Sequence, residues 1–530
     1  MNDILIKNAT IIDGTGAPRF RGDLGISGGK IIMNGLSDKA ESVIDAGGRI
    51  VSPGFIDAHS HGDLVLGMEI SSLCKTTQGV TTEITGQCGL SIAPVNPRYL
   101  DLAKQVLSVA TNVFPEDMAN WESFLRYLEY ADKQPLTVNS KMLIGHSTIR
   151  IAVMGLANRA ATQEELEKMK FLLKEAMDAG AAGFSTGLIY TPCCYADRNE
   201  IIELAKVIRP YNGIYASHMR NESCDVVKSV EETIEVGRQA GVRVCISHHK
   251  ALGRSNWGLQ KQTLERIHDA REKGINVICD QYPYTCCMTH MSACIPPWHL
   301  DQGYPAMTQK LKDPAFRKTL QKEMADPSTP YDNYYLNAGG WNGVLVATAA
   351  KTPEAEGLFL AEYAEKTGKE PFDAFFDLMI SNRCESTAVY SSMCEQDVCE
   401  IAADEFCVVG SDGLTRSWTE KGHPRACGTF PHAICYFVKE KGIISLEGMI
   451  HKMTGLTAGF AGLSDRGTIK EGNAADLIIF DYDRLKDTAT YKNPNSITEG
   501  IDYVIVNGEI VYQDKKLTGV HSGKILRHNT

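Results

Sequence analysis

Val51-Ser-Pro-Gly-Phe-Ile-Asp-Ala-His-Ser-His61-Gly-Asp63 is the stretch that says most about the fold and the chemistry of this chain. Pro53-Gly54 marks a turn, and Phe55-Ile-Asp-Ala-His reads as a short buried strand. Side chains two positions apart on a strand point to the same face, so His59 and His61 can reach one metal ion together. A single His-x-His pair also occurs in surface loops and in protein cores. Whether this pair binds a metal therefore depends on which other metal-competent residues the chain contains.

The composition of the chain is that of an ordinary globular protein. Of its 530 residues, 43% are hydrophobic and 22% are charged, which is enough apolar material for a large core. The net charge of −11 leaves no basic footprint, so neither nucleic acid nor an anionic membrane is expected as a partner. No apolar run approaches the roughly 18 residues that a membrane-spanning helix requires.

The N-terminus and the cysteines favour a cytoplasmic, reducing compartment. Met1-Asn-Asp-Ile-Leu-Ile-Lys-Asn8 lacks the charged-then-apolar layout of a signal peptide. The chain has 16 cysteines, and in a reducing compartment these are more plausible as metal ligands or catalytic groups than as a disulfide framework.

Both ends of the chain read as β structure. Short strands broken by Gly and Asn fill the first 50 residues, Ala475-Asp-Leu-Ile-Ile-Phe480 is a strand, and Tyr503–Tyr512 is a hairpin across Asn507-Gly508. We therefore expect residues 1–54 and 467–530 to form one small β-sandwich domain, with residues 55–466 inserted between its two halves.

Strands alternate with helical segments through the middle of the chain, which predicts a parallel sheet. One clear helix is Thr162–Met177, which is amphipathic with a polar first turn. So many units without a Gly-rich dinucleotide fingerprint favour an α/β fold of the closed (β/α)8 barrel type. Residues 286–345, rich in Pro, Trp, Tyr and Met, interrupt the alternation and predict an inserted lid.

Metal-competent side chains stand at the ends of nearly all these strands. The carboxyl ends of barrel strands meet at one mouth, so residues far apart in sequence are expected to share one cavity. Four histidines, one thiolate and one carboxylate form a mixed donor set that suits zinc. The six residues are His59, His61, Cys88, His218, His248 and Asp412.

An ordered series of motifs gives the chain a specific family resemblance. The motifs are Pro53-Gly-Phe-Ile-Asp-Ala-His-Ser-His61, Gln87-Cys-Gly-Leu-Ser-Ile-Ala-Pro94, Gly183-Phe-Ser-Thr-Gly-Leu-Ile-Tyr190, Ser217-His-Met-Arg-Asn-Glu222, Ser247-His-His-Lys250, Tyr282-Pro-Tyr-Thr285, Gly410-Ser-Asp-Gly413 and His423-Pro-Arg425. With them, nearly the whole chain resembles the N-acyl-D-amino-acid deacylase (D-aminoacylase) branch of the amidohydrolase superfamily.

The resemblance implies a metal-dependent amidohydrolase that cleaves N-acyl-D-amino acids and that carries one tightly bound zinc with a second, weaker position. Cys88, His218 and His248 match the tight site, and His59, His61 and Asp412 match the looser one. Asp412 also matches the catalytic acid and base.

The resemblance also implies a set of substrate-binding residues. Lys250 and Tyr282 match residues that hold the substrate carboxylate, and Tyr190 matches a further pocket tyrosine. Arg425 is open between a substrate carboxylate and Asp63 as its partner. Arg220 and Glu222 are expected to form a buried charge network behind His218.

Two stretches depart from the family pattern. Cys193-Cys194 and Cys286-Cys287-Met288 stand where small residues are common, so the side-chain specificity of relatives does not transfer directly. These cysteines either soften the pocket or simply pack in a reducing compartment. His432 stands where an arginine is common, and we have no account of it.

Three other functions compete with deacylation. A dipeptidase acting on Xaa-D-Xaa dipeptides would cleave the same kind of amide, and a cyclic-amide hydrolase ranks lower because such relatives use a modified lysine where this chain supplies Cys88. A non-catalytic scaffold would not need the full donor set. In each enzymatic case the partner is a small molecule, and a homo-oligomer is left open.

Overall fold

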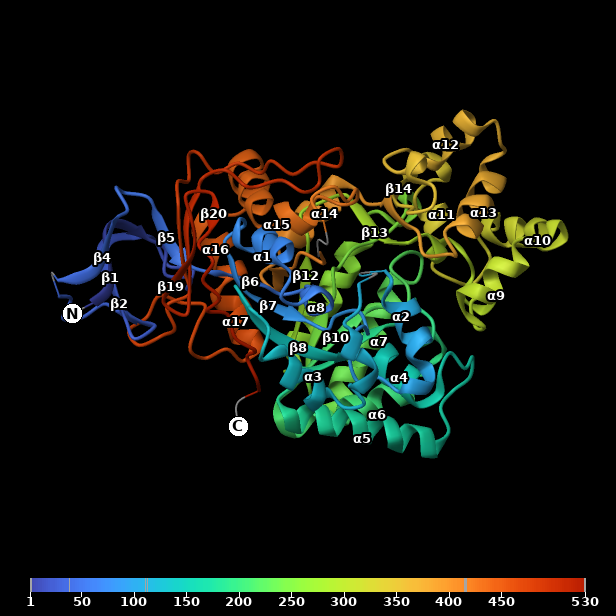
Figure 1. The fold of residues 1–530 in the computed structure, drawn as a ribbon, viewed down its shortest axis with the longest axis horizontal. Helices are drawn as coiled ribbons and strands as arrows, with labels where there is room; N and C mark the ends of the chain where they lie inside the picture. The colour runs from blue at the N-terminus through green and yellow to red at the C-terminus, as the bar shows by residue number, and fades with distance from the viewer. Residues whose placement is uncertain (1, 38, 110, 112, 414–416, 529–530) are drawn as a thin grey trace.

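The alternating middle of the chain folds as a parallel eight-stranded sheet that closes into a barrel (Figure 1). The computed structural model describes residues 2–37, 39–109, 111, 113–413 and 417–528. The barrel strands are β6 (Phe55–Asp57), β7 (Val80–Thr85), β8 (Asn139–Gly145), β9 (Gly183–Gly187), β10 (Ile214–His218), β11 (Arg243–Ile246), β12 (Val277–Gln281) and β16 (Cys407–Val409). The predicted barrel is confirmed.

Hydrogen bonds between the first and last strands close the ring just beyond their ends. The Ala58 amide donates to the Val409 carbonyl at 3.2 Å, and the Asp412 amide donates to the His59 carbonyl at 2.7 Å. This closure brings Asp412 next to the His-x-His pair, although most of the chain separates them in sequence.

Alternation along each strand sorts the barrel side chains into an inner and an outer core. On β12, Ile278 joins the interior cluster, whereas Val277 and Cys279 face the surrounding helices. The helices of the barrel part are α1 (Glu69–Thr76), α2 (Leu100–Leu107), α3 (Phe124–Ala131), α4 (His146–Met154), α5 (Gln163–Ala179), α6 (Arg198–Ile208), α7 (Val226–Ala240), α8 (Gln260–Glu272), α14 (Glu395–Ala403), α15 (Arg425–Ala433), α16 (Leu446–Met453) and α17 (Gly455–Ala461).

Helix α5 shows how locally the sequence dictates these elements. Thr162 caps its first turn in a capping box with Glu165, and Gly180, at a φ of 110°, ends it in the left-handed conformation. Its buried residues Leu166, Met169 and Leu173 recur at helical spacing, so the helix packs one apolar face against the barrel.

The two chain ends pair into one small β domain, as predicted. Strand β5 (Ile50–Pro53) runs antiparallel to β17 (Leu477–Phe480), which joins the N-terminal and C-terminal strands. By hydrogen bonding, the nine strands of the domain form one continuous sheet. The other strands are β1 (Asn2–Ile11), β2 (Phe20–Ser27), β3 (Lys30–Ile32), β4 (Ala40–Asp45), β18 (Ile501–Val506), β19 (Glu509–Gln513) and β20 (Lys516–Leu517).

An insertion between β12 and β16 forms the other end of the molecule (Figure 1). It contains a three-stranded sheet of β13 (Cys286–His290), β14 (Val344–Thr348) and β15 (Thr387–Ser391), in which β15 pairs with both others. The stretch expected at 286–345 is therefore part of a longer unit. Its helices are α9 (Gly303–Lys310), α10 (Pro314–Ala325), α11 (Tyr334–Asn337), α12 (Leu360–Thr367) and α13 (Pro371–Ser381).

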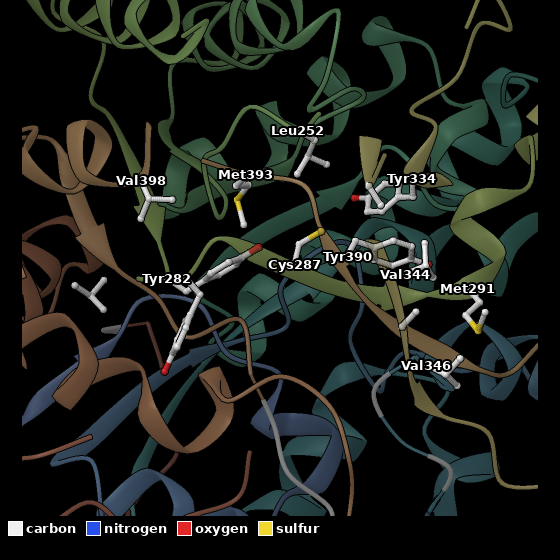
Figure 2. Packing of buried hydrophobic residues seen from close by; sticks show 14 of the residues in the cluster. Leu252, Tyr282, Cys287, Met291, Tyr334, Val344, Val346, Tyr390, Met393 and Val398 are labelled. Atoms are coloured by element: carbon white, nitrogen blue, oxygen red, sulfur yellow. The ribbon is translucent and has the colours of Figure 1, made fainter. Parts of the chain in front are cut away.

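The core of the insertion continues into the barrel mouth. Figure 2 shows Tyr282 from the barrel together with Cys287, Tyr334 and Tyr390 from the insertion, and all four belong to one buried hydrophobic cluster. Burial raises the pKa of the Cys287 thiol to about 12, so this cysteine is a neutral packing group.

Two general features concern membrane-spanning helices and disulfide bonds. None of the described helices combines the length and the apolarity that crossing a bilayer requires. The described residues include all 16 cysteines, and no disulfide bond joins any of them.

Candidate metal centre and active site

Five of the six predicted donor residues line one cavity at the carboxyl ends of the barrel strands. The cavity, including the part open to solvent, has a volume of about 930 Å³. His59 is fully buried directly behind this lining. The donor residues at the wall are His61, Cys88, His218, His248 and Asp412.

The Cys88 thiol is at the centre of the cluster. Its Sγ lies 3.3 Å from Nε2 of His59 and 3.3 Å from Nε2 of His248. Oδ1 of Asp412 lies 3.6 Å from Nε2 of His59. The donor atoms of these four residues all lie within 4.8 Å of one another, a spacing at which one ion can bind several of them.

His61 extends this cluster on the side of Asp412. Its Nε2 lies 3.2 Å from Oδ1 of Asp412. Burial would lower the pKa of His61, but Asp412 and Cys88 outweigh burial and raise this pKa to about 9.

His218 supplies the clearest sign that the site is built for a metal. Its ring lies beside that of His248, with centroids 4.4 Å apart, and it is 3% exposed. Among the described residues neither ring nitrogen has a hydrogen-bond partner. A buried imidazole without a partner costs free energy unless a ligand satisfies it, and a zinc ion would do so.

The electrostatics of the cluster hold its two anionic ligands, Cys88 and Asp412, in the charged form that binds a cation. Burial alone would raise the pKa of the Cys88 thiol, but His59 and His248 overcome this and hold it well below its ordinary value. Burial opposes ionisation of Asp412 as well, and Arg425 and His248 nevertheless hold the pKa of its carboxyl well below the usual range.

The backbone is strained at three of the donor positions. Cys88, His248 and Asp412 have φ values of 54°, 35° and 48°, in the left-handed region that residues with a Cβ rarely occupy. Such strain persists only where the surrounding structure enforces it, and it is concentrated at functional sites. The fold therefore stabilises an otherwise unfavourable arrangement of these side chains.

Asp280, at the end of β12, orients two of the histidines and was missed in the sequence. Its Oδ2 lies 3.2 Å from Nδ1 of His59, and its Oδ1 accepts a 2.9 Å bond from the His248 amide. Bonding at Nδ1 fixes the ring so that Nε2 points towards Cys88. In the sequence, Asp280 stands out only as a charged residue near the end of an apolar strand. Many positions without a function share this feature.

Glu222 and Lys250 form a buried ion pair next to His248. Nζ of Lys250 lies 2.6 Å from Oε1 of Glu222 and 2.7 Å from Nδ1 of His248. Glu222 is also 3.6 Å from Nε2 of His218, so its expected place behind the histidines is correct. Arg220 does not join this network, because it turns away to Glu232 on α7, at 3.1 Å.

The remaining predicted substrate residues also reach the cavity. Nη1 of Arg425 lies 2.8 Å from Oδ2 of Asp412, so Asp412 and not Asp63 is its carboxylate partner. The guanidinium stacks over the ring of Tyr282 at 4.8 Å, and Tyr190 contacts the His218 ring, with centroids 4.9 Å apart.

A second cavity of about 1020 Å³ adjoins the first, and Tyr190, Leu90 and Val109 line both. Its wall mixes apolar residues such as Leu188 and Leu300 with polar ones such as Ser292 and Asp332. The cationic Arg220 at its edge is already paired with Glu232.

Proteins of known function resemble this chain over nearly its whole length. The chain matches the amidohydrolase family over residues 42–318 and 404–512. It is 36% identical to the D-aminoacylase of Alcaligenes xylosoxydans xylosoxydans, over 99% of this chain and 97% of the relative. It is 34% identical to the N-acyl-D-aspartate deacylase (99% and 95%) and to the N-acyl-D-glutamate deacylase (99% and 97%) of the same organism.

Solved structures agree with the sequence comparison. A D-aminoacylase whose binuclear metal centre is described by one-metal activation and second-metal attenuation superposes with a TM-score of 0.83 at 34% identity, over 99% of this chain and 100% of the other. The N-acyl-D-glutamate deacylase of Bordetella bronchiseptica, in complex with zinc and a phosphonate that mimics the tetrahedral intermediate, gives 0.82 at 32% identity, over 99% of each chain.

Proposed function

The chain belongs to the amidohydrolase family, and we propose that it hydrolyses the amide bond of N-acyl-D-amino acids in a zinc-dependent reaction, releasing a carboxylate and a free D-amino acid. The observation that carries the proposal is the buried donor cluster around Cys88, which faces a cavity that also holds the cations Lys250 and Arg425. The full-length similarity to enzymes named for this reaction supports it.

The donor set fits zinc, and it divides into two positions. Cys88, His218 and His248 would hold the tight ion, with a thiolate that favours zinc over magnesium or calcium. His59, His61 and Asp412 would form the looser position. When bound, zinc supplies Lewis acidity that polarises the substrate carbonyl and acidifies the attacking water.

Asp412 moves the proton. Its ionised carboxylate takes a proton from the attacking water as general base and returns it to the leaving amine nitrogen as general acid. The ion pair with Arg425 keeps this carboxylate charged, and the contact with His61 aims Oδ1 into the cluster.

Arg425, Lys250 and Tyr282 orient the substrate carboxylate. A guanidinium carries five N–H donors, so Arg425 can keep its ion pair with Asp412 and present a further donor to the ligand. The charges of Lys250 and Arg425 are matched by those of Glu222 and Asp412.

We further propose that the substrate side chain is apolar. The second cavity begins at Tyr190, beside the donor cluster, and the described cation on its wall, Arg220, is bound to Glu232. An acidic side chain placed there would share the wall with Asp332 and meet an arginine that is already paired, whereas a leucine or methionine side chain would gain burial against Leu188 and Leu300. Substrates of the D-Leu or D-Met type therefore fit better than D-Asp or D-Glu.

The competing functions have less support. The full-length relatives are an aminoacylase and two deacylases, which does not favour a dipeptidase or a cyclic-amide hydrolase. A cytoplasmic location is part of the proposal, supported by a cysteine content that suits a reducing compartment, and a homo-oligomer is left open.

The test measures how fast zinc-loaded protein hydrolyses N-acetyl-D-leucine, N-acetyl-D-methionine, N-acetyl-D-glutamate and N-acetyl-D-aspartate. Xaa-D-Leu dipeptides and a hydantoin are assayed as substrates of the competing functions. We expect release of the apolar D-amino acids to be fastest. Hydrolysis confined to the dipeptides or the hydantoin would refute deacylation, and faster release of D-glutamate would refute the apolar side-chain pocket alone.

A further inference from the structure

A second cluster of titratable side chains lies buried beside the metal centre and outside the proposed chemistry. Sγ of Cys193 is 2.8 Å from Nδ1 of His146, and Nε2 of the same ring is 2.8 Å from Oε1 of Glu200. Cys193 and His146 are both fully buried. A thiol, an imidazole and a carboxylate are thus joined in one line of hydrogen bonds.

Buried Arg150 completes this cluster. Its Nη1 lies 2.5 Å from Oε1 and 2.7 Å from Oε2 of Glu200, which fixes the carboxylate. Burying so many polar groups is unfavourable unless each has a partner, so the cluster needs a purpose beyond filling space. Apolar side chains at this position would cost less free energy to bury.

Charge separation between the thiol and the ring is favoured. Burial would lower the pKa of His146, but Cys193 and Glu200 raise it to about 9. Burial would raise the pKa of Cys193, but the neighbouring His146 lowers it below its ordinary value. The sulfur is thereby a strong hydrogen-bond acceptor.

This acceptor is used by the backbone next to the metal cluster. The Gly187 amide donates to Sγ of Cys193 at 3.4 Å. Gly187 ends β9 and pairs in register with His218 on β10. A Cβ on Gly187 would lie 2.1 Å from the Cys88 carbonyl oxygen, which shows how closely this turn supports the strained Cys88 backbone.

The same turn carries Tyr190, and the other end of the cluster supports the same loop. The Tyr190 amide donates to the Gly187 carbonyl at 3.0 Å, and the Leu188 amide donates to the His218 carbonyl at 2.9 Å. Next to His146, the Ser147 amide donates to the Gly89 carbonyl at 3.0 Å. The His146–Cys193 contact therefore braces the loop of Cys88 from both sides.

We propose that Cys193, held by His146 and Glu200, is a positioning residue that fixes the Gly187–Tyr190 turn against Cys88 and His218. Without the sulfur, the buried Gly187 amide loses its acceptor, and the turn relaxes away from the Cys88 carbonyl. The Cys88 backbone then leaves its left-handed conformation more easily, and Tyr190 loses its defined place beside His218. The inference rests on the proposed function for its kinetic consequence but not for its structural one.

The test compares Cys193→Ala with Cys384→Ala. Cys384 is a fully buried thiol of the insertion, near Thr308, so its truncation has a similar packing cost far from the metal centre. We expect Cys193→Ala to release zinc to a chelator about tenfold faster than the wild type, the scale known for partners that orient metal ligands. Its kcat should fall more than its KM rises, and Cys384→Ala should match the wild type in both.

The ultraviolet absorbance of thiolate in zinc-free protein gives a second readout that needs no activity. The wild type should exceed Cys193→Ser in thiolate absorbance at neutral pH, and Cys193→Ser should release zinc at a rate between the wild type and Cys193→Ala, because its hydroxyl can still accept the Gly187 N–H. If Cys193→Ala does not fold, Cys193→Ser decides. Zinc release equal to that of Cys384→Ala, or an unchanged absorbance, would overturn the proposal. Absence of deacylase activity in the wild type would instead overturn the proposed function.

Discussion

Nη1 of Arg425 lies 2.8 Å from Oδ2 of Asp412, so the cation proposed to bind the substrate carboxylate also holds the proposed catalytic base. Arg425 begins α15, and Asp412 follows β16. The pair couples substrate binding to the ionisation of the base. One connected set of charges can thus bind the substrate carboxylate and keep the base ionised.

Replacing Arg425 by methionine should move the acid limb of the pH–rate profile to higher pH. Arg425 is the leading charge that holds the pKa of Asp412 low against burial. Without it this pKa rises, the base is protonated at a higher pH, and kcat/KM is lost earlier as the pH falls. The KM for the D-amino-acid substrate should rise as well. An unshifted acid limb would show that Arg425 does not control the base.

Asp412→Asn should remove most of the activity while leaving the tight zinc in place. An amide cannot accept the water proton, so kcat should fall by roughly 100- to 10,000-fold. Zinc content after dialysis and steady-state kinetics check this. Full activity in the variant would mean that another group is the base.

Cys88→Ala and His61→Ala should differ in metal content. Cys88 lies between two imidazoles at 3.3 Å, so its loss should release the tight zinc on dialysis. His61 contacts the cluster through Asp412, and its loss should leave that zinc bound. Metal analysis of the two dialysed proteins measures the difference. Equal retention would show that the two positions are not distinct.

Leu300→Arg should shift the substrate preference towards acidic side chains. The new cation would lie on the wall of the second cavity, where it could pair with a D-glutamate side chain. Its bulk should also lower kcat/KM for N-acetyl-D-leucine by about tenfold. Leu300→Met, which preserves volume and polarity, is the matched control and should keep the wild-type preference. An unchanged ratio in Leu300→Arg would place the substrate side chain elsewhere.

The barrel and the convergence of the donors could be predicted because both depend on local patterns. Parallel strands put their carboxyl ends at one edge, so His59, His218 and His248 meet there whatever the order of the strands. The pairing of the two chain ends into one β domain followed likewise from short strands and from the turn at Asn507-Gly508, where both residues have positive φ.

What could not be predicted depends on contacts between distant segments. Asp280 reaches His59 only because β12 and β16 lie next to each other and the ring closes onto β6. Arg220 faces Glu232 because the chain turns after β10, which local spacing does not reveal. The length of the insertion is set by β15, which pairs with strands far from it in sequence.

Zinc-dependent deacylation of D substrates is tested most directly by the release of D-methionine from N-acetyl-D-methionine. The wild type is assayed with and without zinc and compared with its action on the L enantiomer and with Asp412→Asn. We expect rapid release from the D substrate by the zinc-loaded wild type alone. Equal turnover of the L enantiomer, or undiminished turnover by the zinc-free protein, would contradict this expectation.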